Sequence, residues 1–162
     1  MQIRRIDLAD VAIVGDLWAE MSRELQQTVA EFCALSPEAS DHFLNYLGAS
    51  LVTGAGFGFL AVADGEVGGF ALGQVKTAQP PYPPVPFGYI TALYVRPALR
   101  RQGMGRALLR SLGECFRQKG VQEMELHVHA GNPGALAFWT SLGFSPLGFR
   151  LGRVLPPTVL DW

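Results

Sequence analysis

Arg100-Arg101-Gln102-Gly103-Met104-Gly105 is the stretch of this sequence that decides the fold. A strand-like run, Tyr89 to Val95, precedes it, and an amphipathic helix is predicted to follow over residues 105–119. Two glycines let the backbone approach a ligand without a Cβ in the way. The unpaired amides of the first helical turn then attract negative charge, and the arginines add planar donors for phosphate oxygens. The stretch therefore predicts a loop that binds a diphosphate.

This loop is not specific by itself, because short glycine patterns recur by chance. It lacks the Gly-Lys-Ser/Thr of the mononucleotide P-loop, and its Gly-x-Gly spacing departs from the dinucleotide fingerprint. Taken alone, it also fits an ordinary turn from a strand into a helix. A second motif further along the chain is what favours the ligand-binding interpretation.

The second motif follows the strand-like run Met124-Glu125-Leu126-His127-Val128-His129. Its positions are Asn132, Ala135, Trp139, Gly143 and Phe144. Together the two motifs resemble the GCN5-related N-acetyltransferase (GNAT) superfamily. In that superfamily one strand leads into Arg/Gln-x-x-Gly-x-Gly/Ala, and a later strand leads into Asn-x-x-Ala, an aromatic residue and Gly-Phe. The first of these patterns is filled here by Arg100, Gly103 and Gly105.

The resemblance implies an α+β fold with a central mixed, mostly antiparallel sheet of about six or seven strands and about four flanking helices. The fourth and fifth strands would be splayed apart, and acetyl-CoA would lie in the splay as co-substrate, with its diphosphate on the loop. The implied reaction moves an acetyl group to the amine of a small-molecule or peptide acceptor within a ternary complex. The residues that the resemblance places at the coenzyme are Leu93, Tyr94, Val95, Arg100, Arg101, Gln102, Gly103, Met104, Gly105, Arg106, Asn132, Ala135, Phe138 and Trp139.

At 162 residues, the sequence suits one domain, residues 1–162, with a sizeable core. Its 13 basic and 14 acidic residues give a net charge of −1, so no overall field favours nucleic acid as a partner. The local basic cluster therefore indicates either a ligand site or a solvated face, and its members are Arg96, Arg100, Arg101, Arg106 and Arg110. Cys33 and Cys115 lack metal-type spacing, so we expect no metal and a buried Cys115 on the apolar side of its helix. No signal peptide or membrane-spanning run is evident, which favours a cytoplasmic protein without a membrane partner. A monomer and a homodimer both stay open.

Hydrophobic periodicity and turn residues outline the other elements. Strands are predicted over residues 2–6, 57–63, 66–75 and 122–128, and helices over 11–25, after 36–38 and over 133–142. Asp64-Gly65 predicts a primed hairpin turn, and Asp10 is a candidate cap for the first helix. The proline-rich segment 79–87 predicts a stiff loop that either lines the acceptor site or merely spaces two strands. The tail, residues 149–162, is expected to add one or two strands.

Attack of an amine on a thioester needs a group that takes the amine proton, a donor for the developing oxyanion and an acid for the leaving thiolate. Many relatives carry a carboxylate on the fourth strand and Tyr on the last helix, where this sequence has Thr91-Ala92 and Trp139. The indole N–H is not a useful acid, so we expect Trp139 chiefly to pack against the coenzyme. His127 stands where some relatives place a catalytic carboxylate, which makes it the candidate general base. A purely structural role stays open for His127 and His129.

Three functions fit the sequence. The first is an acetyl-CoA-dependent N-acetyltransferase. The second is a GNAT module that holds acyl-CoA for a sensing or regulatory role without catalysis, which the missing carboxylate and Tyr support. The third is a nucleotide or nucleic-acid site at residues 100–106, which the near-neutral charge and the second motif argue against. A small, partly apolar acceptor is weakly favoured by the aromatic residues expected near the groove: Phe32, Phe43, Tyr46, Tyr82 and Phe87.

Overall fold

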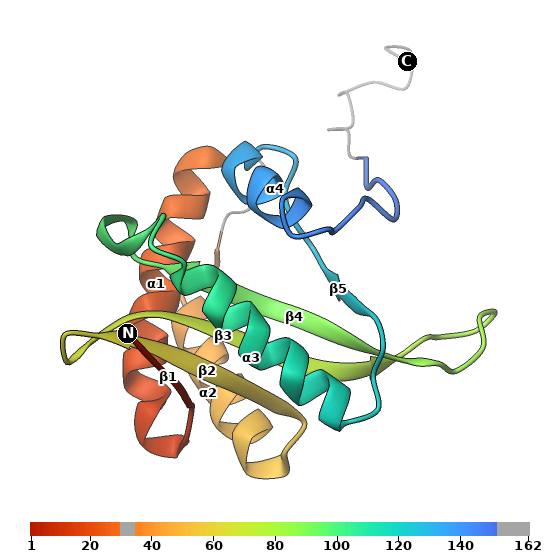
Figure 1. The fold of residues 1–162 in the computed structure, drawn as a ribbon, viewed down its shortest axis with the longest axis horizontal. Coiled ribbons are helices and arrows are strands. Elements are labelled where there is room, and N and C mark those ends of the chain that lie inside the picture. Colours follow the sequence, from red (N-terminus) through yellow and green to blue (C-terminus); the bar gives the residue numbers. More distant parts are fainter. Residues whose placement is uncertain (30–34, 152–162) are drawn as a thin grey trace.

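The computed structural model describes residues 1–29 and 35–151. Within these residues the chain forms one five-stranded sheet in the order β1-β2-β3-β4-β5 (Figure 1). The strands are β1 (Gln2–Arg5), β2 (Gly56–Ala63), β3 (Glu66–Thr77), β4 (Pro86–Val95) and β5 (Met124–Leu126). Neighbouring strands are antiparallel except for β4 and β5, which run parallel. The predicted mixed, mostly antiparallel sheet is confirmed.

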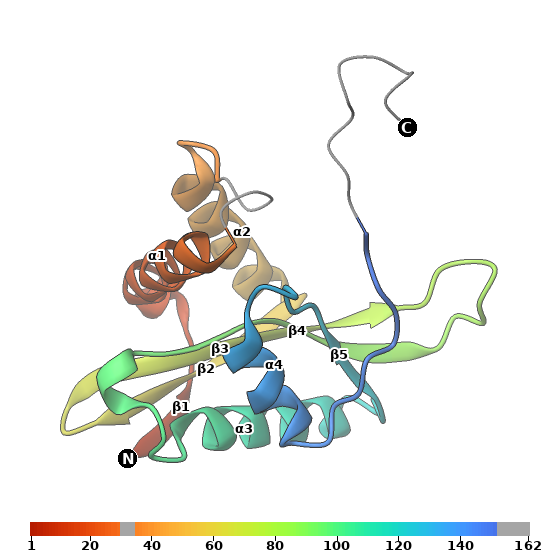
Figure 2. The same ribbon diagram turned by 90° about the horizontal axis from the view of Figure 1, so that it is seen from above.

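Helices cover both faces of this sheet (Figure 2). The helices are α1 (Val11–Thr28), α2 (Ala39–Thr53), α3 (Met104–Gln118) and α4 (Pro133–Thr140), with the short 3-10 turns η1 (Leu8–Asp10) and η2 (Pro97–Leu99). One core lies between the sheet and α1 and α2, around Val14 and Leu17, and the other lies under α3, around Leu108 and Phe116. The α+β class with about four helices is therefore confirmed. None of the helices in the described residues is both long and apolar enough to cross a membrane.

Glycines in β3 and β4 let α3 pack closely on the sheet. A Cβ added at Gly73 or Gly88 would lie 2.8 Å from the ring of Phe116, which is 1% exposed. The ring fills the space that the glycines leave, and its burial contributes about 2 kcal/mol. This packing holds α3 across β3 and β4, so that the N-terminus of α3 follows closely on the C-terminal end of β4 (Figure 1).

The turn between β2 and β3 has the predicted primed geometry. Asp64 and Gly65 both have positive φ, at 52° and 83°. Positive φ at both central residues matches the right-handed twist of the strands on either side. The two strands meet over the whole length of β2, with one register shift at Ala61 and Val62.

The splay between β4 and β5 is also present. The two strands pair at only three positions, Gly88 with Met124, Tyr89 with Glu125 and Ile90 with Leu126. β4 then continues to Val95, whereas the chain after β5 turns away toward α4 (Figure 2). The second edge of β4 is therefore open beyond Ile90, along the part of the strand that leads to α3.

The strand count differs from the expectation. The described residues form five strands rather than six or seven, and β5 spans Met124–Leu126 instead of 122–128. β5 is short because β4 bulges just after Ile90, where the pairing stops. Residues 149–151 are not in a strand, and the rest of the predicted tail strands, 152–162, lies outside the described residues.

Asp10 does not cap α1 as the sequence suggested. No side chain caps the first turn of α1, and the Asp10 carboxylate instead accepts hydrogen bonds from Arg4 Nη1 and Nη2, at 2.7 and 2.6 Å. It also accepts a hydrogen bond from the Asp7 amide, at 3.0 Å. A bidentate bond from a guanidinium is stronger than a bond from a neutral amide, which explains the choice of partner. The Arg4 side chain thereby holds the pKa of Asp10 below its ordinary value.

Candidate functional site

The loop from β4 to α3 presents a run of free backbone amides. Arg101 and Gly103 have positive φ, 64° and 82°, and Gly103 is the N-terminal cap of α3 without any capping side chain. In the part of the chain that the structure describes, the amides from Arg101 to Arg106 donate to no acceptor. The first amide that does is Ala107, which donates to Gly103 O at 3.0 Å. A helix N-terminus of this kind favours a bound anion.

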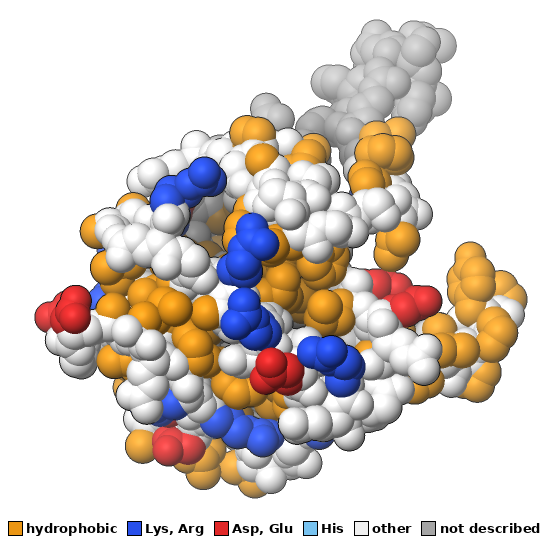
Figure 3. All heavy atoms as spheres, viewed as in Figure 1, with side chains coloured by type: hydrophobic (Ala, Val, Ile, Leu, Met, Phe, Trp, Pro, Cys, Tyr) orange, Lys and Arg blue, Asp and Glu red, His pale blue; other side chains and the backbone are white. Residues whose placement is uncertain are grey.

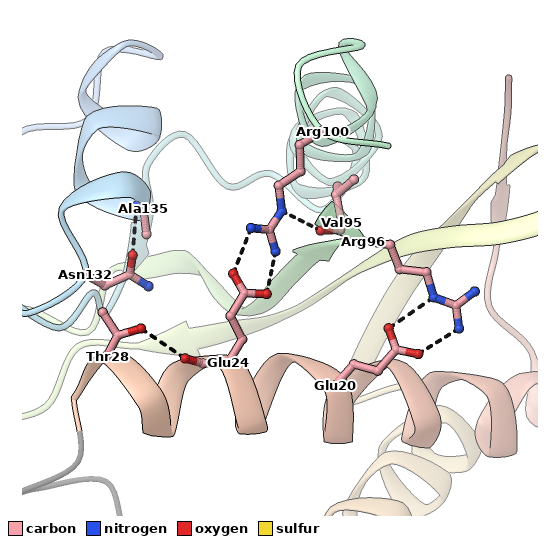
Figure 4. A network of polar contacts seen from close by, with 8 residues as sticks. All are labelled: Glu20, Glu24, Thr28, Val95, Arg96, Arg100, Asn132 and Ala135. Atoms are coloured by element: carbon pink, nitrogen blue, oxygen red, sulfur yellow. Dashed lines mark hydrogen bonds and ion pairs between the residues drawn. The ribbon is translucent and has the colours of Figure 1, made fainter. Parts of the chain in front are cut away.

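Two arginines of the predicted basic cluster are occupied within the protein (Figure 4). Arg100 donates to both carboxylate oxygens of Glu24 at 2.7 Å, and its Nε donates to Val95 O at 2.8 Å. Arg96 donates to Glu20 at 2.8 and 3.1 Å, and this bond lowers the pKa of the Glu20 carboxyl. Both arginines therefore join the end of β4 to α1. As long as Arg100 stays paired with Glu24, only its backbone is available to a ligand.

The other three arginines of that cluster remain available to a ligand. Arg101, Arg106 and Arg110 are exposed, and none of them forms an ion pair among the described residues. They belong to the loop and to α3, where Figure 3 shows basic side chains on the surface. Their charge adds to that of the helix N-terminus, so this corner of the molecule favours a ligand with several negative charges.

The open edge of β4 offers backbone groups next to this corner. Thr91 has no partner in the register with β3, where Ile90 and Ala92 are paired on either side of it, and none in the register with β5. The side chain of Tyr94 is 6% exposed, and burial, followed by the neighbouring Glu20 and Glu24 charges, raises its pKa. Tyr94 could therefore contribute only main-chain groups to a ligand.

α4 packs beside the loop, against the first turn of α3. Asn132 caps this helix, because its Oδ1 accepts a hydrogen bond from the Ala135 amide at 3.0 Å. A Cβ added at Gly105 would lie 3.2 Å from Cζ of Phe138, so the Phe138 ring rests on the bare backbone of the first turn of α3. The second glycine of the loop thus serves the contact between α3 and α4 as well as access to the amides.

Trp139 belongs to the core. It is 8% exposed and meets Phe138 and Phe144 edge to face, with ring centroids 5.0 and 5.1 Å away. It packs in the same cluster as α3. The predicted packing role fits this position, whereas its contact with a coenzyme stays a prediction.

His127 and His129 lie on the chain just after β5, beyond the point where it separates from β4. Their ring centroids are 4.9 Å apart and the rings are nearly perpendicular, at 86°. His127 is exposed and His129 is half-buried. Burial, and then the neighbouring His127, lowers the pKa of His129. Together they form a pair of imidazoles on the segment that joins β5 to α4.

The described residues contain no group of three or more His, Cys, Asp or Glu side chains placed to hold a metal ion. Cys115 is buried with a free thiol, as expected, whereas Cys33 lies outside the described residues.

Comparison with known proteins identifies the family. The family model of the acetyltransferase (GNAT) family matches residues 18–144, and the chain therefore belongs to this family. Among curated proteins, the chain is similar to the [ribosomal protein bS18]-alanine N-acetyltransferase of Escherichia coli (strain K12), with 33% identity over 92 residues. The match covers 57% of this chain and 57% of the length of that relative.

Solved structures share the fold. A tetramutant of the BH1408 protein from Bacillus halodurans has a TM-score of 0.85 at 19% identity and covers 96% of this chain and 100% of its own. A "predicted acetyltransferase with acetyl-CoA" from Clostridium acetobutylicum has a TM-score of 0.71 at 18% identity and covers 99% and 97% of the two chains. At these identities the likeness concerns the fold alone.

Sequence reasoning missed two features of this region. It did not foresee that Glu20 and Glu24 pair with the arginines at the end of β4, because the partners stand 76 residues apart in the chain. Glu20 and Glu24 are four residues apart, and this spacing places both carboxylates on one face of a helix. It was the one signal in the sequence that could have indicated a shared acidic surface. Sequence reasoning also did not single out Glu123 and Glu125, which line a cavity beside the proline-rich loop.

Proposed function

We propose that this chain transfers the acetyl group of acetyl-CoA to a primary amine. Membership of the acetyltransferase family and the related fold solved with acetyl-CoA support the coenzyme. The relative named for acetylating an alanine of a ribosomal protein supports an amine acceptor. The observation that carries the proposal is the run of free amides from Arg101 to Arg106, which opens onto the unpaired edge of β4.

The binding half of this function follows from the loop. Its amides and the positive end of α3 would hold the diphosphate, and Arg101, Arg106 and Arg110 would neutralise further phosphate charge. From there the free edge of β4, between Thr91 and Val95, gives main-chain partners to an extended amide-containing arm. Bound in this way, acetyl-CoA would supply an activated acyl group at the middle of the sheet.

The acetyl transfer itself requires a role for each of three groups near the splay. Thr91 has no Cα partner in either register, and its amide is the candidate donor to the developing oxyanion. His127 is the candidate acceptor of the amine proton, directly or through water, because an ordinary alkyl amine is protonated at neutral pH. The buried ring of Trp139 limits the access of water from α4. Orientation of the two reactants alone can contribute about 7–11 kcal/mol, so the proton transfers need supply only part of the rate.

A second candidate is an acyl-CoA-binding module without catalysis. The bulge of β4 carries Thr91 and Ala92 instead of a carboxylate, and the aromatic residue of α4 is a buried Trp139 instead of a Tyr. Both departures remove groups that could move protons. This alternative shares the coenzyme site and differs only in turnover.

Calorimetry with CoA, followed by an amine screen that measures thiol release and acetylated product by mass spectrometry, tests both candidates. The main proposal expects CoA binding together with thiol release that depends on the amine. Binding without release by any amine of a broad panel would favour the module. The absence of CoA binding would overturn both.

A further inference from the structure

A cavity of about 370 Å³ lies between the loop that joins β3 to β4 and the start of β5. One wall is apolar and includes Pro80, Tyr82, Val85 and Phe87. Glu123 and Glu125 also line the cavity, and Glu125 is half-buried. Figure 3 shows acidic side chains beside this hydrophobic loop, which projects from the body of the molecule. The cavity thus combines an apolar slot with two negative charges.

The two carboxylates are not neutralised by the rest of the described chain. Neither forms an ion pair or a side-chain hydrogen bond with another described residue, and no basic side chain lines the cavity. The neighbouring cation on the sheet is Lys76, whose Nζ lies 3.4 Å from the centroid of the Tyr89 ring. Lys76 is thus engaged with an aromatic face and not with either carboxylate. The net charge of the cavity wall is negative.

The cavity and the proposed reaction site are lined by residues of the same segment of chain. Glu125 pairs with Tyr89 of β4, and His127 follows it by two residues. Met124 and Leu126 pack into the core under α3, so the alternate positions, which are Glu123, Glu125 and His127, face the other side of the extended chain. Alternate residues in an extended chain are about 7 Å apart. A ligand that reaches from His127 into the cavity therefore needs a length of about 7 to 13 Å.

We propose that this cavity binds a second cationic group of the acceptor, carried on a short aliphatic stem. The inference rests on the proposed function and narrows its substrate class to dibasic amines. One amine would be acetylated near His127, while the other stays protonated between Glu123 and Glu125. The stem would lie against Tyr82 and Phe87, which gives apolar contact and a favourable aromatic surface for the cation.

The test compares two probes that differ only in the second charge, hexamethylenediamine and hexylamine. Their affinities are measured by calorimetry on the protein saturated with CoA, with CoA binding measured in the same series. Exposed carboxylates favour a cation modestly, so we expect the diamine to bind about tenfold more tightly than the monoamine. The double variant Glu123→Gln/Glu125→Gln should lose this preference. The control double variant Glu66→Gln/Glu114→Gln removes the same two charges at exposed positions away from the cavity and should keep the preference, and thermal melts check that each variant folds.

Equal affinity for the two probes, no binding of either, or an unchanged preference in the double variant would each overturn the inference. A dimer that dissociates when Tyr82 is replaced by Ser would also overturn it, because a second copy would then cover the cavity. Failure of CoA to bind would count against the proposed function instead, and the CoA titration makes that outcome visible separately.

Discussion

Replacement of Gly103 by Asp isolates the role of the loop amides. Gly103 has φ of +82°, and a Cβ added there would have no atom within 4 Å, so the substitution meets no clash inside the protein. The left-handed conformation costs an L-residue about 1 kcal/mol. An Asp at the N-cap of α3 regains about the same amount by accepting from the free amides of the first turn. The free energy of unfolding should therefore change by about 1 kcal/mol or less.

The effect on the coenzyme should be much larger. The new carboxylate would occupy the amides that the diphosphate needs and would lie beside its charges. Two unit charges about 4 Å apart repel by about 4 kcal/mol at an effective dielectric constant near 20. Because the loop is exposed, solvent reduces this to about 3 kcal/mol or somewhat less, which corresponds to a loss of affinity of about a hundredfold.

Gly103→Asn is the matched control, since it has the same shape and backbone strain without the charge. Isothermal titration with CoA gives the affinities, and thermal unfolding checks the fold. We expect Asn to weaken binding by about tenfold at most, through competition for the amides, and Asp to weaken it far more. If Gly103→Asp binds CoA within threefold of the wild type while both variants melt normally, the diphosphate does not contact this loop.

Three further predictions concern the rest of the site and the fold. His127→Gln should raise the pKa of His129 in an NMR titration, because a neighbouring positive charge is removed, and should lower turnover more than CoA affinity. An unmoved His129 pKa would contradict the coupling. Asp10→Asn should lower the free energy of unfolding by about 1–3 kcal/mol by breaking the bond to Arg4. The folded-state pKa of Asp10 is depressed, so its stabilisation is present above about pH 4 and is lost at lower pH. In chemical denaturation, the difference in free energy of unfolding between the wild type and Asp10→Asn should become smaller below about pH 4. A difference that does not change with pH would contradict the predicted sign. Trp139→Ala should destabilise by about 3–5 kcal/mol in the same assay, because the ring is 8% exposed, and a loss below about 1 kcal/mol would mean that it is not a core residue.

Most elements of the fold could be predicted from local patterns in the sequence. The hairpin at Asp64 and Gly65 and the helix after Gly103 follow from turn chemistry and helical periodicity, and the structure confirms both. These features depend on neighbours within a few residues, so the sequence alone displays them. The mixed, mostly antiparallel sheet and the splay were predicted from the family resemblance, since no local pattern determines which strands pair.

The errors and omissions involve contacts between different elements of the fold. The role of Asp10 depends on Arg4, which packs against it only once β1 and η1 are in place. Likewise, the five arginines looked like one cluster in the sequence, yet Arg100 and Arg96 face α1, where carboxylates neutralise them. Composition could count these charges but could not pair them, because the partner of a side chain is decided by the packing of distant elements.

The central claim is that the amides from Arg101 to Arg106 bind the diphosphate of acetyl-CoA. The most direct measurement is a crystal structure of the protein with CoA at a concentration that calorimetry shows to be saturating. The account predicts diphosphate oxygens at about 2.9 Å from several of these amides, with the rest of the molecule along the open edge of β4. Diphosphate density anywhere else on the protein, with the loop amides bound only to water, would contradict it.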